Sequence, residues 1–283
     1  MFKDIVRTLT PRYGAGEARA MAFILLEDAF GLSRTDIYAG KVKNFSEQDA
    51  LRLQNILQRL LAGEPLQYVL GSALFCGLRF AVSPATLIPR PETEELVEWA
   101  DSLMPALAER QTGDAPALLD AGTGTGCIAI TLACHHPQFR VSAWDLSPEA
   151  LGVARQNAAT HKVQVDFALH DLLTEQPAPS SLNLIVSNPP YVCQRERADM
   201  EAHVLEHEPA LALFVPDDDP LRFYRALERI GRHALRPGGW LLMEINRAYG
   251  NETAALFAAP HWTNTQLRPD SFGNCRMVGT QKL

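Results

Sequence analysis

Ala117-Leu118-Leu119-Asp120-Ala121-Gly122-Thr123-Gly124-Thr125-Gly126 is the stretch that decides the fold of this chain. Its apolar start predicts a buried strand, and its three glycines allow a tight turn into a helix at Cys127–Cys134. Such a strand-to-helix loop lies at the carboxyl edge of a parallel sheet, where ligands bind. The spacing does not match the dinucleotide fingerprint Gly-x-Gly-x-x-Gly, and the lysine of a phosphate-binding loop is absent.

The sequence downstream of this loop alternates between strand and helix patterns. This alternation predicts a largely parallel sheet with helices on both faces. Strands are expected at 141–145, 163–168, 182–187 and 240–245, with helices at 151–160, 221–235 and 251–258 and a final strand pair at 263–267 and 276–281. Pro237-Gly238-Gly239 is expected to form a turn before the strand at Trp240.

Acidic residues follow the next two predicted strands. Asp145 comes 25 residues after Asp120, at a strand end where a carboxylate can accept hydrogen bonds from both hydroxyls of a ribose. Asp171 stands at or just past the end of the following strand, with Leu172 beside it. For Asp171, a simple loop-capping role competes with a role in ligand binding.

Asn188-Pro189-Pro190-Tyr191 leaves the fourth predicted strand as a stiff loop. The two prolines fix φ and supply carbonyl oxygens without N–H groups, and Asn188 adds a side-chain acceptor. Together with the Tyr191 ring, these groups suit a planar NH2 group. An amide nitrogen is a poor nucleophile, and acceptors for its two N–H bonds would direct its lone pair toward an electrophile.

These motifs resemble those of a known class of enzymes. Asp-x-Gly-x-Gly-x-Gly at residues 120–126 resembles motif I of S-adenosylmethionine-dependent methyltransferases. In these enzymes the position of Asp171 commonly contacts the adenine amino group, which implies that Leu172 beside it packs on the adenine face. Residues 188–191 resemble the (Asn/Asp/Ser)-Pro-Pro-(Tyr/Phe/Trp) signature of methyltransferases that act on adenine N6, cytosine N4 or the glutamine amide. The resemblance implies a methyl donor bound at the sheet edge.

The part of the chain before the sheet is predicted to be helical over residues 1–70. Apolar residues recur at helical spacing in Glu17–Leu32, and Ser46 with Asp49 predicts a capping box for a second helix that ends at Gly63. Leu74–Val82 predicts a hairpin that turns near Gly77. In the Ile88–Glu95 stretch, Pro91 and the acids predict a helix start, whereas Arg90 has no such explanation and is a candidate substrate-binding residue.

Several segments together resemble the peptide chain release factor glutamine methyltransferase family (PrmC/HemK). The segments that carry the resemblance are 63–71, 75–82, 87–94, 187–191 and 208–213. It implies an α/β protein with a Rossmann-like, seven-stranded class I methyltransferase domain at 89–283, preceded by a small α-helical bundle at 1–72 that docks substrate and a hairpin linker at 73–88. It further implies S-adenosyl-L-methionine as cofactor, S-adenosyl-L-homocysteine as product, and N5 of the glutamine in the Gly-Gly-Gln motif of class 1 release factors as the methyl acceptor.

The family resemblance also implies roles for individual residues. Cofactor binding is expected from Asp120, Gly122, Thr123, Gly124, Thr125, Gly126, Asp145, Asp171, Leu172 and Asn188. Asn188, Pro189, Pro190 and Tyr191 are expected to hold the glutamine and carry catalysis. The family pattern departs at Glu244-Ile245-Asn246, where Glu-x-Gly is usual, and at 270–276, where a shorter turn is usual; both lie away from the expected chemistry.

Other functions remain as alternatives. An adenine-N6 nucleic-acid methyltransferase would share the Asn-Pro-Pro-Tyr motif, and a ribosomal-protein glutamine methyltransferase or a non-catalytic cofactor-binding adaptor are further possibilities. His203-Val204-Leu205-Glu206-His207 matches a zinc-protease pattern, but no third ligand is evident, and we expect no metal. The segment 203–216 is a candidate cover over the substrate.

Composition supports these expectations. The chain has 283 residues, 47% hydrophobic and 21% charged, and its net charge of −7 argues against direct nucleic-acid binding. Its five cysteines form no Cys-x-x-Cys pair, which fits a reducing cytoplasm. No signal peptide and no membrane span are expected, so we predict a cytoplasmic protein. We also predict that it is a monomer and that it acts on a protein partner.

Overall fold

The computed structural model describes residues 1–40, 45–111 and 113–283. These residues form two compact units, each described by itself below. The first contains Met1–Ser72 and Glu201–His207, and the second contains Ala73–Met200 and Glu208–Leu283. Within the described residues, no helix combines the length and the apolar character that crossing a membrane requires.

The first unit is helical, as predicted. Its helices are α1 (Phe2–Phe30), α2 (Arg34–Tyr38), α3 (Glu47–Ala62), α4 (Leu66–Leu70) and α8 (Ala202–His207). The predicted helix from Glu17 is the second part of α1, after a kink at Gly14, where φ is 74°. The predicted capping box is confirmed, because the Ser46 hydroxyl accepts from Asp49 N and the Asp49 carboxylate accepts from Ser46 N, each at 3.1 Å.

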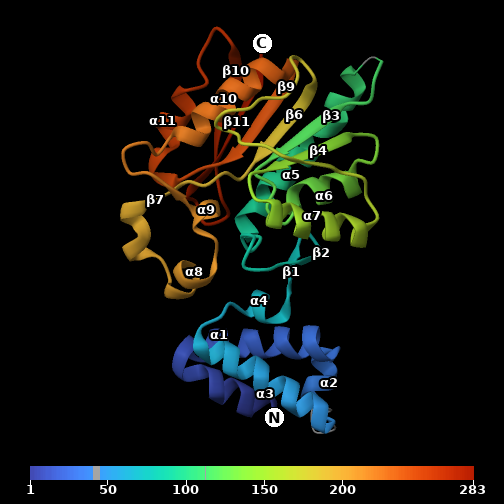
Figure 1. Cartoon of the computed structure of the whole chain (residues 1–283), viewed down its shortest axis with the longest axis vertical. Coiled ribbons are helices and arrows are strands. Elements are labelled where there is room, and N and C mark those ends of the chain that lie inside the picture. Colours follow the sequence, from blue (N-terminus) through green and yellow to red (C-terminus); the bar gives the residue numbers. More distant parts are fainter. Residues whose placement is uncertain (41–44, 112) are drawn as a thin grey trace. The chain divides into compact units, whose positions relative to one another are not determined.

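The second unit is built on a seven-stranded sheet (Figure 1). Its strands in spatial order are β10 (Trp262–Pro269), β11 (Cys275–Lys282), β9 (Leu235–Glu244), β6 (Leu182–Ser187), β3 (Ala117–Ala121), β4 (Arg140–Asp145) and β5 (Asp166–Leu169). The five strands from β9 to β5 are parallel, and β11 is antiparallel to both of its neighbours. The predicted α/β class with a largely parallel, seven-stranded sheet is confirmed.

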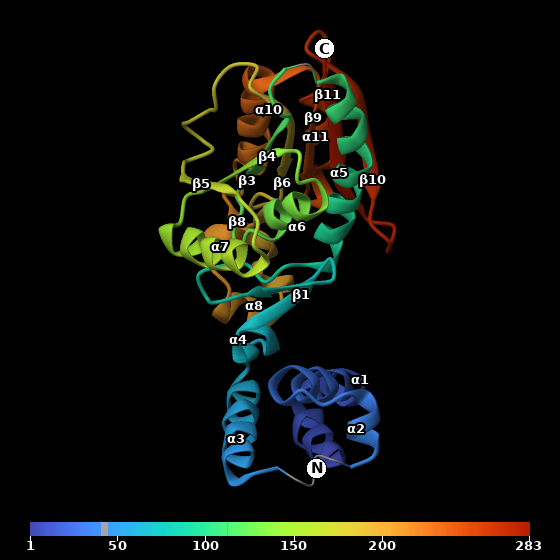
Figure 2. The ribbon, with the colours of Figure 1, turned by 90° about the vertical axis from the view of Figure 1, so that its right-hand side faces the viewer.

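Two apolar cores cover the two faces of this sheet. Strand residues alternate between them: Leu118 and Leu184 belong to one core, whereas Leu119 and Ile185 belong to the other. The first core is covered by α5 (Pro91–Arg110), α6 (Cys127–His135) and α7 (Pro148–His161), and the second by α10 (Arg222–Ala234) with residues after α11 (Gly250–Ala255). Figure 2 shows α5 and α10 on opposite sides of the strands. Since both faces are buried, the central strands are apolar along their length.

Two predicted boundaries are wrong. Pro237–Gly239 is not a turn before the strand but part of β9, since β6 pairs with both Leu235 and Trp240 and the additional residues form an irregularity in register. The third strand begins at Asp166 rather than Val163, because Val163 N bonds back to Ala158 O and closes the end of α7.

Short elements complete the second unit. They are β1 (Ser72–Phe75), which begins at the last residue of the first unit, β2 (Leu78–Ala81), β7 (Val192–Cys193), η2 (Gln194–Asp199), α9 (Ala210–Leu213), β8 (Phe214–Val215) and η3 (Arg247–Tyr249). The predicted hairpin of β1 and β2 turns at Cys76 and Gly77, which have φ of 46° and 73°. The buried Asn157 amide binds both the N–H and the carbonyl of Ala81. A linker role for residues 73–88 stays a prediction.

Candidate functional site

A cavity of about 320 Å³ lies in the second unit, where several parallel strands end at the carboxyl edge of the sheet. The loops after β3, β4, β5 and β6 all contribute to its wall, as expected for ligand sites in open α/β sheets. The predicted site residues that line it are Arg90, Gly122, Thr123, Gly124, Thr125, Asp145, Asp171, Leu172, Asn188 and Pro190. The structure therefore brings most of the predicted residues together around one space.

Asp120 lies buried at the end of β3 and supports the glycine loop. Its Oδ2 accepts hydrogen bonds from Thr123 Oγ1 at 2.6 Å and from Ala129 N at 3.1 Å. Its Oδ1 is buried and has no hydrogen-bond partner among the described residues. Burial raises the pKa of this carboxyl to about 7, against the opposing hydrogen bonds. An unsatisfied, buried acceptor of this kind favours a nearby cationic ligand.

Asp145 holds the glycine loop from the neighbouring strand. Its Oδ2 accepts from Gly124 N at 2.8 Å and its Oδ1 accepts from Ser147 N at 2.9 Å. Burial raises the pKa of Asp145, while these backbone hydrogen bonds lower it. Each carboxylate oxygen keeps a further lone pair, so Asp145 can still accept from a bound diol.

Asp171 and Leu172 form the third part of the wall. Asp171 Oδ1 accepts from Leu173 N at 2.8 Å, which is the loop-capping contact that competes with a ligand role. Leu172 is buried, and its carbonyl accepts from Arg229 at 2.9 Å. The Arg229 guanidinium thus fixes the loop that carries both predicted adenine contacts.

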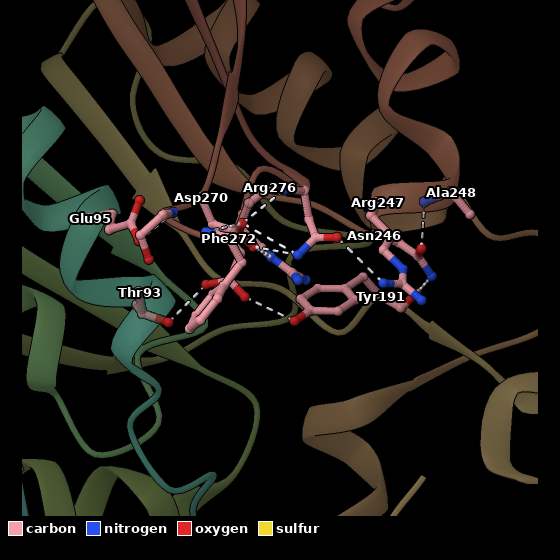
Figure 3. Close-up of polar contacts among 12 residues, drawn as sticks. Thr93, Glu95, Tyr191, Asn246, Arg247, Ala248, Asp270, Phe272 and Arg276 are labelled. Atoms are coloured by element: carbon pink, nitrogen blue, oxygen red, sulfur yellow. Dashed lines mark hydrogen bonds and ion pairs between the residues drawn. The ribbon is translucent and has the colours of Figure 1, made fainter. Parts of the chain in front are cut away.

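Asn188 is half-buried at the end of β6 and lines the cavity. Its Nδ2 donates to Thr93 Oγ1 at 3.0 Å, and Thr93 donates to Glu244 Oε2 at 2.7 Å. The Tyr191 hydroxyl donates to the other Glu244 oxygen at 2.8 Å (Figure 3). Burial raises the pKa of Glu244, and the Tyr191 pKa is raised by burial and by the Glu244 charge.

Arg90 lines the cavity and also forms an ion pair. Its Nη2 lies 2.5 Å from Glu208 Oε1, and Glu208 Oε2 accepts from Ile88 N at 3.2 Å. Because the Glu208 side chain is fully buried, this pair holds the 208–213 segment against the Ile88–Arg90 loop. Contact between Arg90 and substrate stays a prediction.

Four predicted site residues do not line the cavity, namely Asp120, Gly126, Pro189 and Tyr191. Conversely, sequence reasoning missed Thr93, Glu244 and Asn157 as parts of the site. Glu244 could have been found as a lone acid ending an apolar strand, whereas Asn157, which also donates to Thr125 O, leaves no such signal. Within the described residues, no group of three or more His, Cys, Asp or Glu side chains is placed to hold a metal ion.

Gly126 is required by the turn into α6. It has φ of 80°, and a Cβ there would lie 2.8 Å from Ile130 Cδ1 and 3.2 Å from Ala154 Cβ. We expect Gly126→Ala to lower the free energy of unfolding by roughly 2–4 kcal/mol, from left-handed strain together with overpacking. Urea unfolding measures this. Gly124→Ala is the matched control, because its φ of 55° costs only about 1–2 kcal/mol where no atom lies within 4 Å; equal losses would contradict the packing explanation.

The site fits S-adenosylmethionine, a cationic nucleoside ligand. Asp145, Asp171 and Glu149 line the cavity, and buried Asp120 supports its glycine loop. Arg90 and His170 are its basic residues among those described. Gly124 leaves open space on its cavity side, so a ligand can approach the backbone closely.

Comparisons with known proteins find related sequences. A family described as "Methyltransferase small domain" matches residues 99–213, and one described as "PrmC N-terminal domain" matches residues 2–71. Release factor glutamine methyltransferases from Bacteroides thetaiotaomicron and Flavobacterium psychrophilum are 44% and 38% identical, each over 97% of this chain and over 96% and 95% of their own lengths. A solved release-factor-specific protein-(glutamine-N5) methyltransferase from Alicyclobacillus acidocaldarius is 26% identical over 71% of this chain and 98% of its own, with a TM-score of 0.41. This chain therefore belongs to the release factor glutamine methyltransferase family.

Proposed function

We propose that this chain transfers a methyl group from S-adenosylmethionine to the side-chain N5 of the glutamine in the Gly-Gly-Gln motif of class 1 release factors. The observation that carries the proposal is that Asn188 lines the same cavity as the glycine loop and Asp145. An amide-binding side chain and a cofactor-binding wall thus share one space, as a direct methyl transfer requires.

The cofactor would be held by the glycine loop, Asp145, Asp171 and Leu172. When bound, it supplies an electrophilic methyl group on a positively charged sulfur. Asp145 accepts from the ribose hydroxyls, and Leu172 supplies an apolar surface for the adenine. Asp120 contributes a negative charge close to the loop, which favours a cationic ligand over a neutral one.

Asn188 and Pro189 prepare the acceptor nitrogen. The Asn188 side-chain oxygen and the Pro189 carbonyl accept the two N–H bonds of the glutamine amide, which favours a pyramidal nitrogen with its lone pair available. Pro190 lines the cavity and restricts the plane of the amide, while Tyr191 fixes the loop through its hydrogen bond to Glu244. Alignment of this kind supplies on the order of 7–11 kcal/mol in well-oriented reactions. The nitrogen loses one proton as the methyl group arrives and makes that proton acidic, so water can take it up and a strong general base is unnecessary.

The partner is a release factor, and the first helical unit would help to dock it. The net charge of −7 supports a protein substrate over a nucleic acid. We further propose that the chain acts in the cytoplasm as a monomer. The 203–216 segment is a candidate cover for the bound glutamine.

A methyl-transfer assay tests this function. With labelled S-adenosylmethionine, we expect close to one methyl group per unmodified release factor and no label on the Gln→Ala variant of its Gly-Gly-Gln motif. Parallel reactions contain DNA, RNA or ribosomal proteins. Label in nucleic acid alone would support adenine methylation instead, and label in a ribosomal protein alone would redirect the substrate assignment. Mass spectrometry of the labelled peptide identifies N5 as the modified atom.

A further inference from the structure

We infer that Thr93 and Glu244 are positioning residues that set the direction of the Asn188 amide and thereby make it an acceptor for the substrate. The inference rests on the proposed function, because it concerns how the same amide-binding group is oriented. Thr93 belongs to the first turn of α5 and Glu244 to the last residue of β9, so neither belongs to the Asn188–Tyr191 motif itself.

Glu244 is the fixed end of a hydrogen-bond chain. It is buried, and its two oxygens accept from Thr93 Oγ1 at 2.7 Å and from the Tyr191 hydroxyl at 2.8 Å. In Figure 3, Thr93 lies on one side of the drawn network and Tyr191 on the other. Arg276 lies close enough for its charge to act on Glu244, and it is itself held by Asp270 at 3.1 Å. A buried carboxylate with a nearby cation and two donors is satisfied as an acceptor.

The direction of the next bond follows from counting protons. A threonine hydroxyl has a single proton, and Thr93 Oγ1 donates it to Glu244 Oε2 at 2.7 Å. Thr93 gives that proton to Glu244, so toward Asn188 it can only accept. The group that Asn188 presents to Thr93 must then be its NH2, which agrees with the Nδ2–Oγ1 distance of 3.0 Å.

This direction leaves Asn188 Oδ1 for a ligand, and no hydrogen bond to Oδ1 occurs among the described residues. The flipped amide has almost the same shape, but it would present an NH2 group to the substrate NH2, and two donors cannot bond to each other. The Thr93–Glu244 pair therefore distinguishes two orientations that packing alone would treat as nearly equal.

The hydroxyl and the backbone carbonyl of Tyr191 are both held by residues at the end of β9. Its hydroxyl bonds Glu244, and its carbonyl accepts from Asn246 Nδ2 at 3.0 Å. Asn246 Nδ2 also donates to Glu196, and Asn246 N donates to the buried Tyr224 hydroxyl. The loop that carries the proposed substrate-binding groups is thus fixed by residues 244–246. The expectation that this departure from the family pattern lies away from the chemistry is therefore wrong.

Thr93→Val tests the inference in the full-length chain with release factor as substrate. Valine keeps the shape of threonine but has no hydroxyl, so the Asn188 amide loses its directional partner. We expect kcat to fall by about 10–100-fold, the effect of one misdirected hydrogen bond, with the KM for S-adenosylmethionine within about twofold. Thr93→Ser restores the hydroxyl and is expected to recover kcat to within about threefold.

Thr131→Val is the matched control. Thr131 is also fully buried in the second unit, and its hydroxyl has no partner among the described residues. Removal of the Thr131 hydroxyl reports the general effect of losing a buried hydroxyl group and is expected to leave kcat unchanged. Thermal unfolding of all variants separates folding from turnover.

Glu244→Gln provides a second measurement. The NH2 group of the glutamine can donate to Thr93 Oγ1, and the Thr93 proton can then point at Asn188 and favour the flipped amide. We expect Glu244→Gln to lower kcat in the otherwise unaltered chain. In the Thr93→Val background it should lower kcat little further, because the orientation of the Asn188 amide is already lost. Wild-type kcat in Thr93→Val, or failure of Thr93→Ser to recover activity, overturns the inference alone. Absence of methylation by the unaltered chain overturns the proposed function and the inference with it.

Discussion

Asn188→Ala is expected to lower kcat for release-factor methylation by on the order of 10²–10³-fold, comparable to removal of one donor from an oxyanion hole. Alanine removes the side-chain oxygen that would accept from the substrate amide. It also leaves Thr93 without the donor now 3.0 Å away. The dissociation constant for S-adenosylmethionine is expected to change far less, because Asp145 and the glycine loop remain. Single-turnover kinetics and calorimetry measure the two quantities separately.

Asn264→Ala is the control for this substitution. Asn264 lies on β10, where its amide bonds only the Gln281 side chain at 2.8 Å among the described residues. Turnover at the wild-type level in Asn188→Ala would exclude the proposed amide grip, whereas a lost cofactor affinity would reassign Asn188 to cofactor binding.

Asp120→Asn is expected to stabilise the free chain and to weaken cofactor binding. The folded-state pKa of Asp120 is raised by burial to about 7, above its ordinary value of 3.8. Because the folded chain then binds the proton more tightly than the unfolded chain, Asp120 makes stability fall as pH rises from about 4 to about 7. The asparagine variant avoids this loss, so at pH 8 its unfolding free energy should be higher by on the order of 1–4 kcal/mol. Near pH 4 the gain should vanish.

The same substitution removes a negative charge from the site and should weaken S-adenosylmethionine binding by roughly 30-fold or more. Urea unfolding at several pH values and calorimetry at pH 8 provide the measurements. Asp114→Asn, at an exposed acid six residues upstream, controls for net charge. A variant that is less stable at pH 8 would show that Asp120 is needed ionised for folding, contrary to this expectation.

The sequence predicted the sheet and most of the cavity because both depend on local patterns. Gly122–Gly126, Asp145, Asp171 and Asn188 each follow a recognisable strand, and parallel strands bring their carboxyl ends to one edge. Thr93 lies within a predicted helix start, and the sequence marks Glu244 only as a departure from a family pattern. They meet across 151 residues of chain, and no spacing rule connects such a pair.

Two further features escaped sequence prediction because they depend on contacts between distant parts of the chain. Arg90 lacked an explanation because its partner Glu208 is 118 residues away. The turn expected at Pro237–Gly239 was inferred from residue type alone, yet pairing with β6 keeps this segment in the strand. Tertiary contacts override local preference at such positions.

The place of β11 has a consequence for synthesis. This strand lies between β9 and β10 although it follows both in the chain, so β10 has no neighbour in the sheet until Cys275–Lys282 has left the ribosome. Arg276, whose charge reaches Glu244, arrives with the same strand. Since domains fold as they are synthesised from the N-terminus, helices α1 to α4 can form before the sheet, whereas β10 and Glu244 gain these partners only after β11 has been made. A chain made only as far as β10 would therefore lack both the sheet partner of β10 and the Arg276 charge that acts on Glu244.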